Sequence, residues 1–255
     1  MNVSELYKKL DELIPRSLSC DWDHDGLEVC PEPEKEVNRV LISLDVTDDT
    51  IEKALEENFD LIVAHHPLFF RGLENVSALN CSGKRAVRLI KGNVSVATFH
   101  TRLDALSGGV NDCLASLLGL EEVGTVENNG EAIMRIGNLA HEMKAVDFAA
   151  YVKEKLNAPA TELIGCGKNV KRVAVLGGSG GDDLISAAQA GADTYLTGEL
   201  KYHEKLMSGE LGINIVCGGH FFTEFPVCRM LEKTIGGLCP NVYAEIFFSN
   251  KTEIV

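Results

Sequence analysis

Short apolar runs separated by helix-like stretches constrain the fold of this chain most. In the first half these runs occupy residues 40–44, 60–64 and 94–99, and helical patterns lie between them. Strands that are apolar on both faces are typical of a mainly parallel sheet that helices cover on both sides. The chain is therefore predicted to be an α/β protein with mainly parallel or mixed sheets.

The second half of the chain repeats this pattern. Its runs lie at residues 173–176, 191–196 and 213–217. Val40 and Val173 are 133 residues apart, and so are Asp60 and Asp193. A constant separation of this kind indicates an internal duplication, so we expect two topologically related domains.

The expected helices follow from apolar residues at helical spacing. Pro15 closes the first helix, and Thr47, Asp48 and Asp49 are N-cap candidates for the second. The last helix is expected after the glycine-rich turn Gly177–Gly181. The predicted helices cover residues 3–13, 47–55, 82–90, 146–156 and 182–189.

Length and charge limit the number of domains and the kinds of partner. A chain of 255 residues can form two domains, predicted here as residues 1–120 and residues 121–255. The formal net charge of −14 disfavours binding to duplex DNA or an anionic membrane, because phosphate neutralisation requires clusters of Lys and Arg. Nucleic acid and membrane are therefore not expected as partners.

The sequence shows no signal for secretion. Its N-terminal segment is charged and amphipathic, and no stretch approaches the roughly 20 apolar residues that span a bilayer. The eight cysteines are scattered and include no C-x-x-C pair, which is typical of reduced thiols in the cytosol. We expect a cytoplasmic protein.

A histidine followed four residues later by a carboxylate occurs at the end of one predicted strand in each half. The pairs are His100 with Asp104 and His220 with Glu224, and 120 residues separate the two histidines. Ligands of α/β sheets gather beyond the carboxyl ends of the strands. The doubled pattern therefore indicates a metal site assembled from both halves.

His65 and His66 add two imidazoles at the end of another strand. Successive side chains of a strand point to opposite faces, so adjacent histidines could each hold one ion of a close pair. Imidazole and carboxylate without thiolate favour two divalent ions of zinc, iron, manganese, nickel or cobalt. The alternative for any one histidine is a hydrogen-bonded core residue. The expected metal ligands are His65, His66, Asp104, His220 and Glu224.

Three further features allow two interpretations each. The turn Gly177–Gly181 follows a strand and opens a helix, which suits a phosphate group, but a tight turn explains it equally well. Glu199 and His203 match the region of the adjacent histidines and could give or accept a proton, or simply start a helix. Cys217 precedes a predicted ligand, but it is expected in the core because no second thiol accompanies it.

The chain resembles the dinuclear metal centre proteins, also known as GTP cyclohydrolase I type 2 homologues or NGG-interacting-factor-three-like proteins. The matching segments occur in family order over nearly the whole chain. They are DWDHDGLEVC, VLISLDVT, DLIVAHHPLFF, FHTRLDALSGGVNDCLA, VAVLGGSG, GADTYLTGELKYHE and GGHFFTE. The chain departs from the family pattern at His24, Asp25, Cys30 and Arg102, and none of these is an expected ligand.

This resemblance implies two α/β domains of related topology with a two-metal site in the cleft between them. It implies the same five ligands, with Glu224 as the bridge between the ions. His100 matches a family histidine near the metals that would support the ligands or carry protons. The resemblance also implies a ring-shaped homohexamer with the sites facing its interior.

The residues and the resemblance together favour a metal-dependent hydrolase. A water activated by the ions would attack the substrate, and His100 or Glu199 would move protons. The substrate could be a small, nucleotide-like molecule. The alternative is a metal-binding hexamer that is not an enzyme and acts through interaction or regulation. An open coordination position would favour the enzyme, and a closed one would favour the interaction protein.

Overall fold

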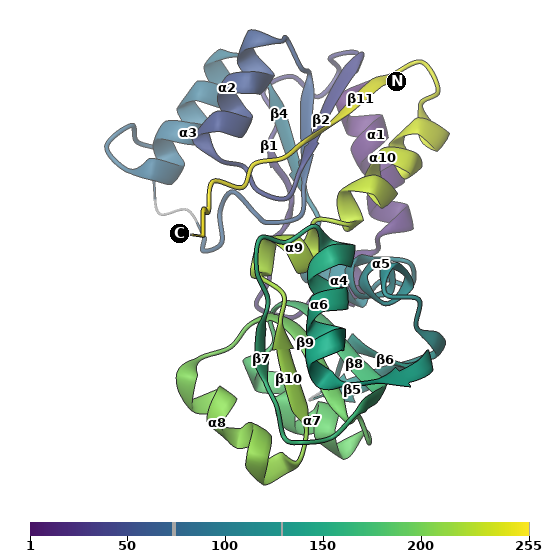
Figure 1. Ribbon diagram of the computed structural model, residues 1–255. Helices are drawn as coiled ribbons and strands as arrows, with labels where there is room; N and C mark the ends of the chain where they lie inside the picture. The colour runs from purple at the N-terminus through teal and green to yellow at the C-terminus, as the bar shows by residue number, and fades with distance from the viewer. Residues whose placement is uncertain (73–74, 129, 255) are drawn as a thin grey trace. The chain divides into compact units, whose positions relative to one another are not determined.

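The chain folds into two units in a computed structural model that describes residues 1–72, 75–128 and 130–254 (Figure 1). The first unit comprises Met1–Leu103 and Cys228–Asn250, and the second comprises Asp104–Val227 and the residues from Lys251. This division differs from the predicted boundary after residue 120. The reason is that residues 104–120 pack on the second sheet, whereas the segment before the C-terminus adds a strand to the first.

Five strands form the sheet of the first unit. In spatial order they are β1 (Gly26–Val29), β4 (Ser95–Thr98), β3 (Leu61–Ala64), β2 (Arg39–Ser43) and β11 (Tyr243–Phe247). β1 is antiparallel to β4, and the other neighbours are parallel. Every residue of β3 and β4 is buried, as their apolar sequences predict for strands covered on both faces.

Helices cover both faces of this sheet (Figure 1). One side carries α1 (Val3–Leu13) and α10 (Val227–Leu238), and the other carries α2 (Asp48–Glu56) and α3 (Cys81–Lys91). Asn2 and Glu5 form a capping box at the start of α1, and Thr47 caps α2 as predicted. A short 3-10 helix, η1 (Arg16–Leu18), follows α1, and α4 (Thr101–Ala105) follows β4.

The sheet of the second unit is mixed. Its spatial order is β5 (Glu121–Asn128), β6 (Glu131–Met143), β8 (Val170–Ser179), β9 (Thr194–Glu199), β10 (Asn214–Cys217) and β7 (Glu162–Ile164). The three predicted strands β8, β9 and β10 are parallel. β5, β6 and β7 pair antiparallel with their neighbours at the two sides of the sheet.

Alternating residues of β8 supply two separate cores in this unit. Val173 and Val175 pack with α5 (Val110–Leu117) and α6 (Ala145–Leu156), whereas Ala174 and Leu176 pack with α7 (Leu184–Gln189) and α8 (Tyr202–Leu211). The helix predicted from Asp182 begins as a 3-10 turn, η2 (Gly181–Asp183), before α7. One further short helix, α9 (His220–Glu224), follows β10.

Both sheets contain the predicted internal duplication. Three adjacent parallel strands have the order β4-β3-β2 in the first unit and β10-β9-β8 in the second. Asp60 Oδ2 accepts hydrogen bonds from the backbone amides of Asn38 and Arg39, at 2.8 and 3.0 Å. Asp193 Oδ2 accepts the equivalent pair at the start of β8, at 2.9 and 2.7 Å. The repeat therefore extends to individual hydrogen bonds.

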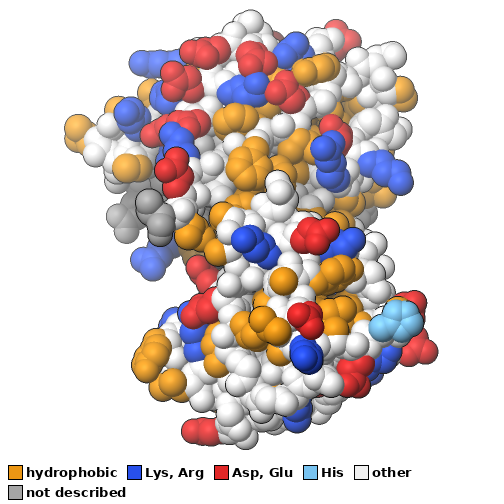
Figure 2. Space-filling view, in the orientation of Figure 1, with side chains coloured by type: hydrophobic (Ala, Val, Ile, Leu, Met, Phe, Trp, Pro, Cys, Tyr) orange, Lys and Arg blue, Asp and Glu red, His pale blue; other side chains and the backbone are white. Residues whose placement is uncertain are grey.

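The surface carries mixed charges. On the face shown in Figure 2, Lys and Arg side chains lie among Asp and Glu side chains. Among the described residues, every helix is too short or too polar to cross a membrane.

Candidate metal centre

Two adjacent histidines follow β3, and an oxygen atom holds each ring. His65 Nδ1 lies 2.9 Å from the carbonyl oxygen of Phe99, and His66 Nδ1 lies 2.8 Å from Asp45 Oδ1. Because a carbonyl and an ionised carboxylate only accept, each Nδ1 carries a proton and each Nε2 presents its lone pair. Metal-binding histidines almost always have this arrangement, which fixes the tautomer and orients the ring.

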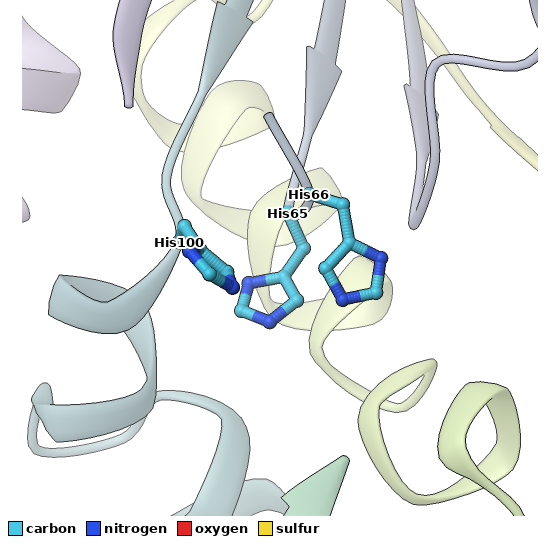
Figure 3. A group of neighbouring side chains, drawn as sticks. All are labelled: His65, His66 and His100. Carbon is cyan, nitrogen blue, oxygen red and sulfur yellow. The ribbon is translucent and has the colours of Figure 1, made fainter. Parts of the chain in front are cut away.

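His100 follows β4 and lies against both of these rings. Its ring centroid is 5.4 Å from that of His65 and 5.7 Å from that of His66. Figure 3 shows the three rings gathered beyond the ends of β3 and β4. Each could offer one ring nitrogen to a metal, and these atoms lie within 4.8 Å of one another. The first unit thus brings together three imidazole groups. The predicted ligands included only two of them, His65 and His66.

Asp23, from the DWDHDG segment, fixes the loop that carries His100. His100 Nδ1 lies 3.2 Å from Asp23 Oδ2, and the same oxygen accepts hydrogen bonds from Thr101 N at 2.9 Å and Thr101 Oγ1 at 2.6 Å. Burial alone would raise the pKa of Asp23, but the contacts with His100 and Thr101 outweigh burial and hold that pKa well below its usual range. Asp23 therefore presents a carboxylate to Nδ1 of His100.

The second unit contributes an imidazole and a carboxylate from a single helical turn. His220 and Glu224 lie four residues apart on α9, so they share one side of the helix, and His220 Nε2 lies 3.2 Å from Glu224 Oε2. Ligand distances of roughly 2.0–2.2 Å place two ligands of one ion about 2.8–3.6 Å apart, from right-angled to tetrahedral geometry. His220 Nδ1 lies 3.0 Å from Glu199 Oε1. Glu199 therefore orients His220 as Asp45 orients His66.

Glycines of the second unit make room for the side chains of His220 and Glu224. A Cβ atom at Gly178 would lie 2.2 Å from Glu224 Oε1 and 3.2 Å from His220 Nε2. A Cβ atom at Gly198 would lie 2.7 Å from His220 Cα. Gly178 also has a φ of +72°, which disfavours other residues. These contacts explain the glycine-rich turn by the packing of α9, so the structure favours the tight-turn interpretation over a phosphate site.

Asp104 is buried on α4, and it is the first residue of the second unit rather than part of the first. Asn111 links the segment of Asp104 to the glycine-rich turn. The sequence pattern did not indicate this residue. The Asn111 side chain donates to the backbone oxygen of Asp104 at 3.3 Å and accepts from Gly177 N at 2.8 Å. His203 is exposed, and its Nε2 lies 3.9 Å from Glu204.

Two departures from the family pattern contact each other. The fully buried Arg102 donates from Nε to Asp25 Oδ2 at 2.9 Å and from Nη1 to Asp11 Oδ1 at 2.6 Å. Asp25 Oδ2 also accepts from His100 N at 2.7 Å. Buried charges are tolerated when they are paired and hydrogen-bonded. The ion pair of Arg102 and Asp25 therefore holds the loop that carries His100 in place.

The donors in both units are nitrogen and oxygen. Cys217 is buried, as predicted, and burial raises the pKa of its thiol to about 11. A protonated thiol is a poor metal ligand. Imidazole and carboxylate donors fit divalent first-row ions, so groups in the described residues could bind a metal.

A family model described as Duf34/NIF3 (NGG1p interacting factor 3) matches residues 1–253. The chain belongs to the Duf34/NIF3 family. Relatives with the name "GTP cyclohydrolase 1 type 2 homolog" include a protein of Clostridium acetobutylicum, which is 30% identical over 245 residues and aligns over 93% of this chain and 90% of its own length. The protein of that name in Campylobacter jejuni is 31% identical over 239 residues, with 93% of each chain covered.

Solved structures show the same Duf34/NIF3 fold. The hypothetical protein SA1388 of Staphylococcus aureus superimposes with a TM-score of 0.91 at 26% identity, covering 100% of this chain and 99% of that one. Reduced HcgD from Methanocaldococcus jannaschii gives a TM-score of 0.84 at 25% identity, covering 96% and 97%. The predicted family and the predicted pair of related α/β domains are confirmed.

Proposed function

We propose that this Duf34/NIF3 protein is a hydrolase that uses two divalent metal ions. The observation that carries the proposal is the common setting of four histidines. In each, Nδ1 faces a carboxylate or carbonyl oxygen at 2.8–3.2 Å. This arrangement is expected of metal ligands and of the histidines that serve them. The four residues are His65, His66, His100 and His220.

The proposed ligands come from both units. Glu224 is the proposed bridge between the ions, and the ions are zinc, iron, manganese, nickel or cobalt. When bound, such ions polarise the substrate and lower the pKa of water toward neutrality. The proposed ligands are His65, His66, Asp104, His220 and Glu224.

His100 and Glu199 are the proposed proton-transfer groups. Because Nδ1 of His100 faces Asp23, its Nε2 can take up a proton and the carboxylate stabilises the resulting cation. The Glu199 side chain is 60% exposed and contacts His220 Nδ1, so it can exchange protons with solvent. His100 would serve the substrate, whereas Glu199 would mainly hold His220.

The name of the relatives supports a nucleotide-like small molecule as substrate. The resemblance also supports a cytoplasmic, ring-shaped homohexamer with the metal sites facing its interior. Light scattering coupled to size-exclusion chromatography measures this assembly directly. A mass near six chains is expected, and a monomer in dilute and concentrated solution would contradict it.

Elemental analysis of His66→Ala and Glu224→Ala tests the site. Each variant should lose at least one of the two ions of the wild type while its circular dichroism spectrum is kept, because each loses a donor at a strand or helix end. The matched control is His203→Ala, which removes an exposed histidine from the same chain. Unchanged metal content in both ligand variants would refute the assignment.

A substrate screen tests the activity. Wild-type protein with two ions should hydrolyse a phosphoester, nucleotide or amide, and a chelator should abolish that hydrolysis. Full metal occupancy with no hydrolysis across the screen would contradict the enzyme and favour the interaction protein.

A further inference from the structure

Two exposed aromatic side chains of the first unit lie against the ring of His100, whose own side chain is only 13% exposed. Trp22 and Phe70 are 51% and 60% exposed, and their ring centroids are 5.8 Å apart. Trp22 contacts the His100 ring at 5.8 Å and Phe70 contacts it at 5.9 Å, with interplanar angles of 73° and 66°. Single exposed aromatic side chains are common. The rings of Trp22 and Phe70 contact each other and also His100. Exposed apolar surface of this kind marks ligand sites.

The segment that carries Trp22 is fixed on both sides. Cys20 N donates to Thr101 Oγ1 at 3.0 Å, and Asp23 accepts from Thr101 N and Oγ1 at 2.9 and 2.6 Å. Asp23 is buried although the tryptophan beside it is exposed. The backbone therefore holds the indole in place without covering it.

The segment that carries Phe70 is fixed in a similar way. Glu28 accepts hydrogen bonds from the backbone amides of Leu68 and Phe69, at 2.8 and 2.9 Å, and from Thr98 Oγ1 at 3.0 Å. Side chains that are positioned before binding lose little conformational freedom when a ligand arrives. The backbone that carries each exposed ring is thus fixed before a ligand binds.

Phe70 also lines a cavity of about 420 Å³. Small-molecule sites usually measure about 300–1,000 Å³. Arg71, Asn80 and Ser82 are among the residues that line it. A guanidinium with an amide and a hydroxyl suits a polar or anionic substituent. Stacking and polar surfaces therefore meet at Phe70.

We propose that Trp22, Phe70 and His100 form a stacking site for a planar heteroaromatic ring of the substrate. The cavity beside Phe70 takes the polar or anionic substituent of that ring. The proposal rests on the proposed function, because it places the substrate ring next to the proton-transfer group His100. Aromatic side chains stack with any flat π-system, so the site selects for the ring and not for one base.

Trp22 is the only tryptophan of the chain, so its fluorescence reports this site alone. The metal-loaded protein is titrated with adenosine monophosphate, guanosine monophosphate and nicotinamide mononucleotide. At least one should quench the emission saturably, whereas ribose phosphate, which has the anion without the ring, should not. Quenching by ribose phosphate to the same extent, or no saturable quenching by any ring-bearing probe, would overturn the proposal.

Phe70→Leu keeps an apolar side chain and removes the ring. It should weaken binding of the quenching probe roughly 5- to 100-fold, the range expected for loss of one stacking partner. Trp22→Leu, followed by calorimetry, should give a similar loss. The matched control Tyr202→Leu removes another exposed ring, 76% exposed, and should leave the affinity unchanged. Equal affinities in all variants would contradict the proposal.

Metal content separates failure of this proposal from failure of the proposed function. Two ions in every variant, without probe binding by the wild type, would refute the stacking site alone. The opposite result is a protein that contains no metal but binds the probe through Trp22 and Phe70. It would refute the proposed metal centre and retain the stacking site. Blue-shifted Trp22 emission that changes with protein concentration and not with probe would show that a second copy covers the rings, and it would overturn the proposal.

Discussion

Replacing Gly178 by alanine should empty the proposed metal centre while leaving the fold intact. The new Cβ atom would lie 2.2 Å from Glu224 Oε1 and 3.2 Å from His220 Nε2. Comfortable non-bonded contacts begin near 3.5 Å, so the carboxylate must retreat by roughly 1 Å. This movement is easy for the protein, because the carboxylate ends a side chain with several rotatable bonds.

The same movement should strongly reduce the affinity for the metal. Ligand distances in metal sites hold to about ±0.2 Å, so a carboxylate displaced by roughly 1 Å no longer coordinates. Changes to residues that only orient a ligand cost about 10- to 100-fold in affinity. Loss of the proposed bridging ligand should therefore cost at least about 100-fold. The backbone cost of alanine at a φ of +72° is about 1–2 kcal/mol.

Gly191→Ala is the matched control. Gly191 has a φ of +83°, and a Cβ atom there would meet nothing within 4 Å. Both variants should lose similar stability in chemical denaturation, but only Gly178→Ala should lose metal in elemental analysis and calorimetric titration. Wild-type metal affinity in Gly178→Ala, or equal metal loss in Gly191→Ala, would refute the reasoning.

Three further substitutions test the oxygen partners of the histidines. Asp45→Asn should lower metal affinity about 10- to 100-fold without abolishing binding, because an amide orients His66 less well than a carboxylate; calorimetric titration measures this, and an unchanged affinity would count against it. Glu199→Gln should lower metal affinity in the same way through His220, and it should also lower turnover because Glu199 is a proposed proton-transfer group; unchanged metal affinity together with unchanged turnover would contradict both roles. Asp23→Asn should destabilise the protein at neutral pH by about 1.5–3 kcal/mol through loss of charged hydrogen bonds. Folding lowers the pKa of Asp23 from 3.8, so the contribution of Asp23 to the free energy of unfolding is present above pH 3.8 and is lost as the pH falls below that value. A difference in unfolding free energy between wild type and Asp23→Asn that stays constant down to pH 2 would contradict this.

The parallel strands of both units could be predicted from the sequence. Burial on both faces leaves a continuous apolar run, so β2, β3 and β4 and their counterparts in the second unit are visible without tertiary information. The separation of Asp60 and Asp193 located the repeat, since each caps the same position of its sheet. The strand ends then indicated where candidate ligands should lie.

The remaining strands could not be placed in this way. β11 returns from the C-terminal segment to the first sheet, and β7 pairs antiparallel with β10. Which segment fills an open sheet edge depends on contacts between distant residues and not on local pattern. The predicted boundary after residue 120 failed to match the two units for the same reason.

The ligand candidates were visible in the sequence, but their supports were not. Asp45 and Asp23 are ordinary loop carboxylates in the sequence, and only folding brings them to His66 and His100. The glycine-rich turn fitted a phosphate site as well as a tight turn, because its contact with Glu224 joins residues far apart in the chain.

A crystal structure of metal-loaded protein with anomalous diffraction tests the central claim most directly. Two anomalous peaks per chain are expected, about 3.5–4 Å apart, with His65, His66 and His220 each coordinating through Nε2 at about 2.0–2.2 Å. Asp104 and Glu224 should complete the coordination, with Glu224 touching both ions. A single peak, or ions held by other residues, would contradict the dinuclear centre.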